Sequence, residues 1–173
     1  MWPRLETSRL PRTCLLAALA LASAHSVCAA VAVGDAFPDM ALANLAGPLP
    51  ATAGNVALVD FWASWCAPCK ASFPAYGRLN AAYAAQGLVI VAVSVDQDPA
   101  AYAIFVKRYG PPFFVTRDAD QKLVAAVDIP TMPTSYLIDR KGKVRFLHTG
   151  FHGDATEAEL RHEIETLLAE KAS

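Results

Sequence analysis

The chain has 173 residues, enough for one domain with a substantial buried core and too few for two. Its 15 lysine and arginine residues nearly balance 16 aspartate and glutamate residues, so the net charge of −1 provides no electrostatic basis for binding nucleic acid. Hydrophobic residues make up 54% of the chain and charged residues 18%, which excludes a disordered protein. We expect one globular domain, with no nucleic acid among its partners.

The N-terminal residues have the three parts of an export signal. Arg4, Arg9 and Arg12 give a positively charged start, residues 14–24 form an apolar run, and small residues before position 30 offer a cleavage site. We predict a signal peptide at residues 1–29 and a single domain at residues 33–173. The alternative is an uncleaved membrane anchor, since the apolar stretch is long enough to span a bilayer. Both versions predict that the domain is delivered across a membrane.

The first predicted element after the leader runs directly into a pair of cysteines. Residues 56–62 are almost continuously apolar, which predicts a strand buried on both faces, and Cys66 and Cys69 follow it. A purely structural disulfide over so short a loop would remove little chain entropy. Structural zinc needs four ligands, and no second cysteine pair exists outside the leader. We therefore interpret Cys66 and Cys69 as a redox pair.

The next elements alternate between helix and strand. Residues 66–86 have apolar positions at helical spacing, and Pro74 should bend that helix. Residues 88–95 are rich in β-branched residues, which predicts a central parallel strand. A second helix opens at Asp98 and ends at Gly110, and we interpret its aromatic stripe as core. A short strand and a short helix follow at residues 113–116 and 120–127.

The C-terminal part predicts a hairpin and a last helix. Residues 135–139 and 144–149 flank a turn and are expected to pair antiparallel. The last helix is predicted to begin at Asp154, with its side chain capping the helix while Glu157 reaches back. Alternating strands and helices followed by a hairpin and a helix predict an α/β fold, a three-layer sandwich with a mixed β-sheet.

Two motifs carry a resemblance to a known family. Residues 59–70, VDFWASWCAPCK, resemble the active-site segment of thioredoxins, and residues 131–134, TMPT, resemble the cis-proline loop of the same family. The long stretch between the motifs and the segment beginning at Gly34 are similar to exported thioredoxins of the TlpA/DsbE type. The resemblance covers residues 33 to the C-terminus. It implies a thioredoxin fold with an N-terminal extension and a central insertion, and a periplasmic thiol:disulfide oxidoreductase.

The chemistry of the pair follows from its position at the start of a helix. The free N–H groups and positive end of the helix favour the thiolate of Cys66, which we predict to be the nucleophile. Cys69, one turn further on, is predicted to resolve the mixed disulfide with a partner. Asp60 ends the apolar strand, where burial should raise its pKa and let it take the proton from Cys69. The alternative is an aspartate bonded only to backbone.

The resemblance also implies a substrate-binding surface. A cis bond between Met132 and Pro133 would turn the loop so that its backbone pairs with an extended substrate segment, the alternative being a trans proline in a simple turn. Trp65 is expected to shield the disulfide and to offer an apolar contact, whereas Phe61 and Trp62 are expected to be packing residues. Lys70 is more simply a solvated lysine than an electrostatic aid to the thiolate.

The direction of exchange and the partners are inferred from the same likeness. Ala67 and Pro68 between the cysteines resemble the dipeptide of reducing thioredoxins, which favours reduction of protein disulfides on exported proteins. Such a reductant needs electrons from a membrane thiol-reducing donor, and we expect no cofactor beyond the redox-active disulfide and a monomeric protein. Cytochrome c or oxidase maturation is a possible setting, although the residue after the cis-proline, often acidic in cytochrome-maturation members, is Thr134. An oxidant or isomerase of the same fold is the alternative.

A copper metallochaperone is a further alternative, because thiolates suit Cu(I) and two histidines occur near the C-terminus. His148 and His152 lack the spacing of a helical metal pair. Copper-carrying relatives of the Sco type are expected to have three residues between their cysteines, and this chain has two. We therefore expect no metal site and predict that both histidines lie at the surface.

Overall fold

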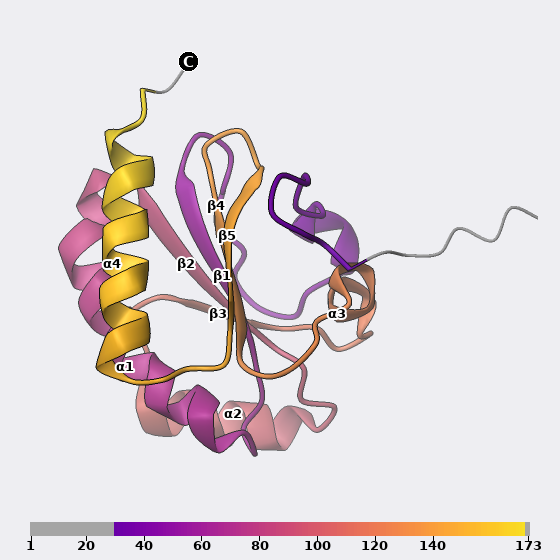
Figure 1. The fold of residues 1–173 in the computed structure, drawn as a ribbon. Helices are drawn as coiled ribbons and strands as arrows, with labels where there is room; N and C mark the ends of the chain where they lie inside the picture. Colours follow the sequence, from indigo (N-terminus) through magenta and orange to yellow (C-terminus); the bar gives the residue numbers. More distant parts are fainter. Residues whose placement is uncertain (1–29, 172–173) are drawn as a thin grey trace, which may run out of the picture.

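The computed structural model describes residues 30–171, so the predicted signal peptide lies outside the described residues. None of the helices within this range combines the length and apolar character needed to cross a membrane. The elements, labelled in Figure 1, are η1 (Met40–Ala43), β1 (Val56–Trp62), α1 (Ala67–Tyr83), η2 (Ala84–Gln86), β2 (Leu88–Ser94), α2 (Pro99–Tyr109), β3 (Phe114–Arg117), α3 (Lys122–Val127), β4 (Thr134–Ile138), β5 (Val144–Thr149) and α4 (Asp154–Ala169).

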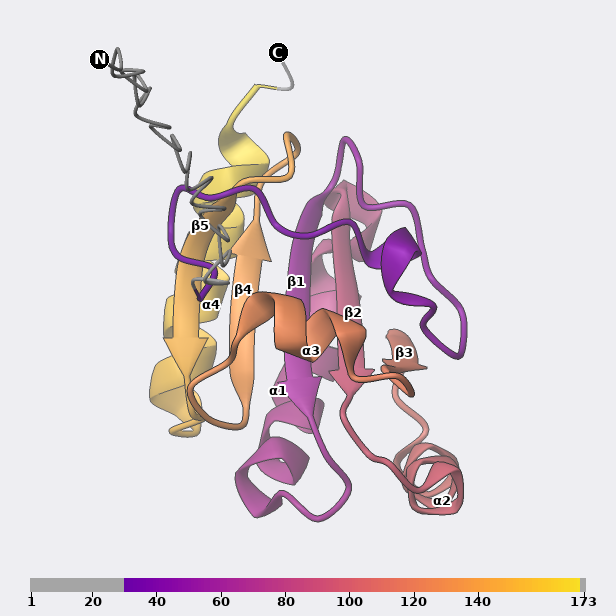
Figure 2. The same ribbon diagram turned by 90° about the vertical axis from the view of Figure 1, so that its right-hand side faces the viewer.

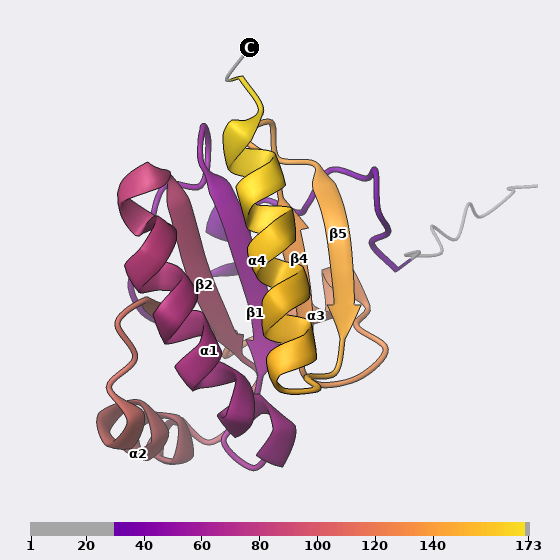
Figure 3. The same ribbon diagram turned by 60° about the vertical axis from the view of Figure 1, so that its left-hand side comes forward.

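Five strands form one mixed sheet in the order β3-β2-β1-β4-β5. The first three strands are parallel, while β4 runs antiparallel to β1 and β5 antiparallel to β4. Helix α3 and the N-terminal segment lie over one face of the sheet (Figure 2), and α1 and α4 cover the other (Figure 3). Helix α2 lies at the end of the sheet where β1 and β2 finish (Figure 1). The predicted three-layer α/β sandwich is confirmed.

Strand β1 is buried along its whole length and divides its side chains between two cores. Ala57 and Val59 belong to the cluster beneath α3, whereas Val56 and Leu58 belong to the cluster beneath α1 and α4. This alternation is expected of a strand covered on both faces. It places Asp60 on the side of α1, the helix that carries the cysteines.

The last helix begins where the sequence predicts, but its predicted cap is wrong. The residue at the N-cap position is Gly153, and no side chain caps the helix. Glu157 instead accepts hydrogen bonds from Arg78 of α1 and Arg161 of α4. A guanidinium gives a carboxylate a stronger, charge-assisted bond than a backbone amide does, and Arg78 reaches Glu157 only through the packing of α1 against α4.

The aromatic stripe of α2 is core only in part. Phe105 is buried against Trp62 and Phe73, with ring centroids 4.3 and 5.0 Å away. Tyr109 stacks on Phe105 but is 40% exposed, because it lies at the last turn of a helix at the end of the sheet. One deep anchor therefore attaches α2 to the region around the cysteines.

Candidate functional site

The two cysteines form a disulfide at the start of α1. Cys66 is the N-cap residue, and its Sγ accepts a hydrogen bond from the backbone N–H of Cys69 at 3.2 Å. Cys69 is fully buried, while Cys66 retains 6% exposure. After reduction, the helix N-terminus and this N–H group stabilise a thiolate on Cys66 more than on Cys69.

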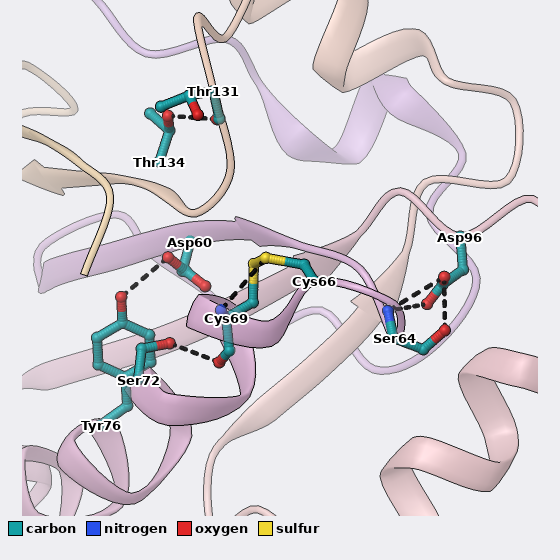
Figure 4. Close-up of a disulfide and its surroundings, with 9 residues drawn as sticks. All are labelled: Asp60, Ser64, Cys66, Cys69, Ser72, Tyr76, Asp96, Thr131 and Thr134. Carbon is teal, nitrogen blue, oxygen red and sulfur yellow. Dashed lines mark hydrogen bonds between the residues drawn. A yellow bond between two sulfur atoms is a disulfide. The ribbon is translucent and has the colours of Figure 1, made fainter. Parts of the chain in front are cut away.

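The loop before the disulfide is held by an aspartate that sequence reasoning did not find. Asp96 is 3% exposed, and its carboxylate accepts hydrogen bonds from the backbone N–H and the hydroxyl of Ser64 and from the hydroxyl of Ser94. Ser64 lies two residues before Cys66, so these bonds fix the approach of the chain to Cys66 (Figure 4). A polar residue just after a predicted strand was the only sign of it in the sequence.

Asp60 lies fully buried beside the cysteine helix, as the sequence predicts. Its Oδ1 accepts a hydrogen bond of 2.9 Å from the hydroxyl of Tyr76, not from the backbone. Its Oδ2 has no hydrogen-bond partner among the described residues and points toward Cys69 (Figure 4). Burial raises the pKa of Asp60 well above its ordinary value, and the bond from Tyr76 offsets part of that rise. A carboxyl with a raised pKa and a free oxygen can exchange a proton with a neighbouring thiol.

The loop before β4 approaches the disulfide from the neighbouring strand. The peptide bond between Met132 and Pro133 is cis, and the carbonyl of Pro133 accepts a hydrogen bond from the N–H of Gly150 at 2.7 Å. Met132 packs against the cluster that contains both cysteines. The hydroxyl of Thr134 donates to the carbonyl of Thr131 at 2.7 Å, which closes the loop on itself (Figure 4).

The surface around the buried disulfide is partly apolar. Trp65 is 68% exposed, whereas Phe61 and Trp62 are fully buried, as predicted for packing residues. Lys70 forms no ion pair within residues 30–171 and borders a hollow of about 240 Å³ between the cysteine loop and α2. A partner that reaches Cys66 therefore meets an exposed indole beside it.

The contacts of the two histidines considered as copper ligands do not include the cysteines. His148 Nε2 is 2.6 Å from Oε2 of Glu163 on α4, and its side chain is only 12% exposed, so it is not the surface group that the sequence suggested. His152 is exposed. Among residues 30–171, no group of three or more histidine, cysteine or acidic side chains is arranged to hold a metal ion.

A disulfide at a helix N-terminus, a buried carboxyl behind it and a cis-proline loop beside it define a thiol:disulfide oxidoreductase of the thioredoxin superfamily. The sequence profile of the Redoxin family matches residues 32–164, and the chain belongs to that family. The predicted resemblance to thioredoxins of the TlpA/DsbE type is confirmed.

Relatives and solved structures agree with this assignment. The chain is 32% identical over 141 residues to the thiol-disulfide oxidoreductase ResA of Geobacillus thermodenitrificans, which covers 80% of this chain and 79% of ResA. It resembles a Chlorobium tepidum protein described as a thiol:disulfide interchange protein DsbE, at 34% identity and a TM-score of 0.74, over 81% of this chain and 100% of that one. StoA of Bacillus subtilis matches at 26% identity and a TM-score of 0.57, over 64% and 82% of the two chains.

Proposed function

We propose that this oxidoreductase reduces disulfides of exported proteins in the periplasm, by cycling Cys66 and Cys69 between dithiol and disulfide. The observation that carries the exchange chemistry of the proposal is the unequal placement of the two sulfurs. Cys66 lies at the N-cap with some exposure, and Cys69 lies fully buried behind it. This asymmetry supports Cys66 as the sulfur that meets the partner and Cys69 as the one that acts inside the protein.

The proposed cycle balances in two exchange steps. The Cys66 thiolate attacks one sulfur of the partner's disulfide, which forms a mixed disulfide and releases the first partner thiolate. Cys69 then loses its proton and attacks Sγ of Cys66, which forms the Cys66–Cys69 disulfide and releases the second thiolate. The partner gains two electrons and two protons, and the protein loses them. No cofactor is needed beyond the disulfide itself.

Asp60 is proposed to accept the proton that Cys69 loses in the second step. The support is its burial on the α1 side of the sheet and an oxygen without a hydrogen-bond partner within the described residues. A carboxylate kept from water is a better base than an exposed one, because burial raises its pKa toward that of the thiol. Deprotonated Asp60 receives the proton, which then passes to solvent or to the leaving thiolate.

Trp65, Met132 and Pro133 are proposed to bind the partner. Trp65 offers an exposed apolar face, and Met132 packs beside both cysteines in the loop that precedes β4. An extended segment flanking the partner's cysteine would pair with the backbone of this loop as an added strand. Recognition of this kind depends on main-chain hydrogen bonds and so accepts many partner sequences.

The setting of the reaction is proposed from the leader and from the residues between the cysteines. Residues 1–29 support export, with residues 33–173 as the periplasmic domain, free or anchored at the inner membrane. The Ala67-Pro68 dipeptide supports the reducing direction, with a membrane thiol-reducing donor restoring the dithiol of a monomeric protein. Cytochrome c or oxidase assembly is the proposed context for the reduced substrates.

The midpoint potential of the cysteine pair tests the direction. The domain is equilibrated in buffers of defined thiol:disulfide ratio, and the dithiol fraction is measured by alkylation and mass spectrometry. We expect a value near that of thioredoxin, roughly −270 mV. A value near roughly −120 mV, that of a strong disulfide donor, would contradict reduction and make the protein an oxidant.

A further inference from the structure

Within residues 30–171, Tyr76 is the one side chain that donates a hydrogen bond to the buried carboxyl of Asp60. It is 1% exposed, it extends from α1 beneath the sheet, and its hydroxyl donates to Oδ1 of Asp60 at 2.9 Å. Within the described residues the second oxygen of Asp60 has no hydrogen-bond partner. Figure 4 shows the carboxyl between Tyr76 on one side and Cys69 on the other. One oxygen is therefore fixed and the other faces the resolving sulfur.

A tyrosine at this place has two physical effects on the carboxyl. It restricts rotation about the last bond of the Asp60 side chain, which would otherwise let either oxygen turn away from Cys69. Its O–H also stabilises the ionised form of Asp60 over the protonated form, since a hydroxyl donates a stronger bond to a carboxylate. Phenylalanine at this position would keep the ring and lose both effects.

We propose that Tyr76 is a positioning residue for the resolving step: it directs the free oxygen of Asp60 toward Cys69 and keeps Asp60 able to ionise while buried. The proposal rests on the proposed role of Asp60 as proton acceptor. It assigns to Tyr76 the task of setting the pH above which Cys69 can resolve the mixed disulfide.

Burial has the larger effect on the pKa of Asp60, and within residues 30–171 Tyr76 is the side chain that opposes it. Helix α1 contributes Tyr76 and Cys69 to the surroundings of Asp60. In the sheet, the cross-strand neighbours of Asp60 are Ser135 of β4 and Ala92 of β2. Among residues 30–171, the pKa of Asp60 responds to burial and to Tyr76, and to no cation. The Ser135 hydroxyl acts one step away, since it interacts with Tyr76 and lowers the pKa of that phenol.

The test is the pH profile of the resolving step in Tyr76→Phe. The reduced protein is mixed with hydroxyethyl disulfide, a small uncharged reagent, and single-turnover samples are quenched with acid. Mass spectrometry separates the dithiol, the mixed disulfide and the closed Cys66–Cys69 disulfide, so each step has its own rate. The readout is the ratio of the resolving rate to the rate of the first attack.

We expect the midpoint of the resolving step to move up by about one pH unit in Tyr76→Phe, with a loss of about tenfold in the ratio below that midpoint. Tyr83→Phe is the matched control, because Tyr83 also lies on α1 but its hydroxyl contacts Glu165 and Arg161. A Tyr76→Phe profile equal to that of Tyr83→Phe would overturn the proposal.

Asp60→Asn separates this inference from the proposal on which it rests. If Asp60→Asn leaves the pH profile unchanged, Asp60 is not the proton acceptor and the earlier proposal fails. If Asp60→Asn removes the midpoint and Tyr76→Phe does not move it, only the role of Tyr76 fails. Should Tyr76→Phe not fold, 3-fluorotyrosine at all tyrosines keeps every ring and makes each hydroxyl a stronger donor, and the midpoint should then move down; an unmoved midpoint would contradict the proposal.

Discussion

Asp96 shows how a single buried residue fixes the loop that leads to Cys66. Three donors, two on Ser64 and one on Ser94, converge on its carboxylate. Asp96→Ala leaves these donors without their acceptor in a site that is largely buried from water. We expect a loss of about 2–4 kcal/mol in the free energy of unfolding, measured by urea denaturation of the oxidised protein.

Asp98→Ala is the matched control for Asp96. Asp98 caps α2 through a hydrogen bond from the N–H of Ala100 and is exposed, so its loss should cost only about 1 kcal/mol. Equal losses in the two variants would mean that the hydrogen bonds from Ser64 and Ser94 to Asp96 stabilise the fold no more than an exposed helix cap does.

At the scale of residues, the sequence predicts the roles that depend on local pattern and misses those that depend on contacts between distant positions. Asp60 stands out because it is a carboxyl in an apolar run, although it lies within β1 and not at the end that the sequence suggested. Cys66 and Cys69 stand out because their spacing has few other uses. Asp96 and Tyr76 act through partners 32 and 16 residues away. Such contacts exist only once the strands and helices are packed, and no spacing rule in one sequence indicates them.

At the scale of elements, α2 depends on one deep anchor. Phe105 is the only buried residue of this helix, and it packs in the cluster that contains Trp62, Cys66 and Cys69. Phe105→Ala should lower the free energy of unfolding by about 3–5 kcal/mol, through lost burial and the cavity left behind. Urea denaturation measures this directly.

The neighbouring position gives the comparison for Phe105. Ile104 lies on the same helix but is 68% exposed, so Ile104→Ala should change the free energy of unfolding by no more than about 0.5 kcal/mol. Similar losses at both positions would show that α2 is not held by its buried ring.

Element prediction succeeds where one pattern dominates and fails where two compete. The continuous apolar runs define β1 and β2, since few other structures accommodate them. At the start of α4, Asp154 and Glu157 match a capping box, yet Arg78 of another helix takes Glu157. The ion pair between helices formed in place of the predicted cap, and it depends on how α1 and α4 pack.

For the whole molecule, the buried carboxyl of the site is a cost to stability. Removing Asp60 from water disfavours its charge, and no cation within residues 30–171 compensates. The hydrogen bond from Tyr76 offsets only part of this. The fold therefore keeps a group that lowers its stability, and the proposed role of Asp60 as proton acceptor gives a reason for keeping it.

This cost has a definite pH dependence in the oxidised protein, where the cysteines do not titrate. Asp60 loses its proton near its ordinary pKa of 3.8 in the unfolded chain and at a higher pH in the folded protein. Between the two pKa values the folded state binds the extra proton, so the contribution of Asp60 to stability is present below 3.8 and is lost as pH rises through the folded pKa.

The asparagine in Asp60→Asn carries no charge at any pH. Its advantage over the wild type should therefore grow with pH, by about 1.4 kcal/mol for each unit that separates the two pKa values, and then level off. Urea denaturation between pH 2 and pH 9 measures the difference. Asp120→Asn supplies a control of opposite sign, because hydrogen bonds from Lys122 and Asn44 lower the pKa of Asp120. That variant should have a smaller free energy of unfolding than the wild type at neutral pH, and the two values should become equal in acid. An advantage of Asp60→Asn that stays constant with pH would show that burial does not raise the pKa of Asp60.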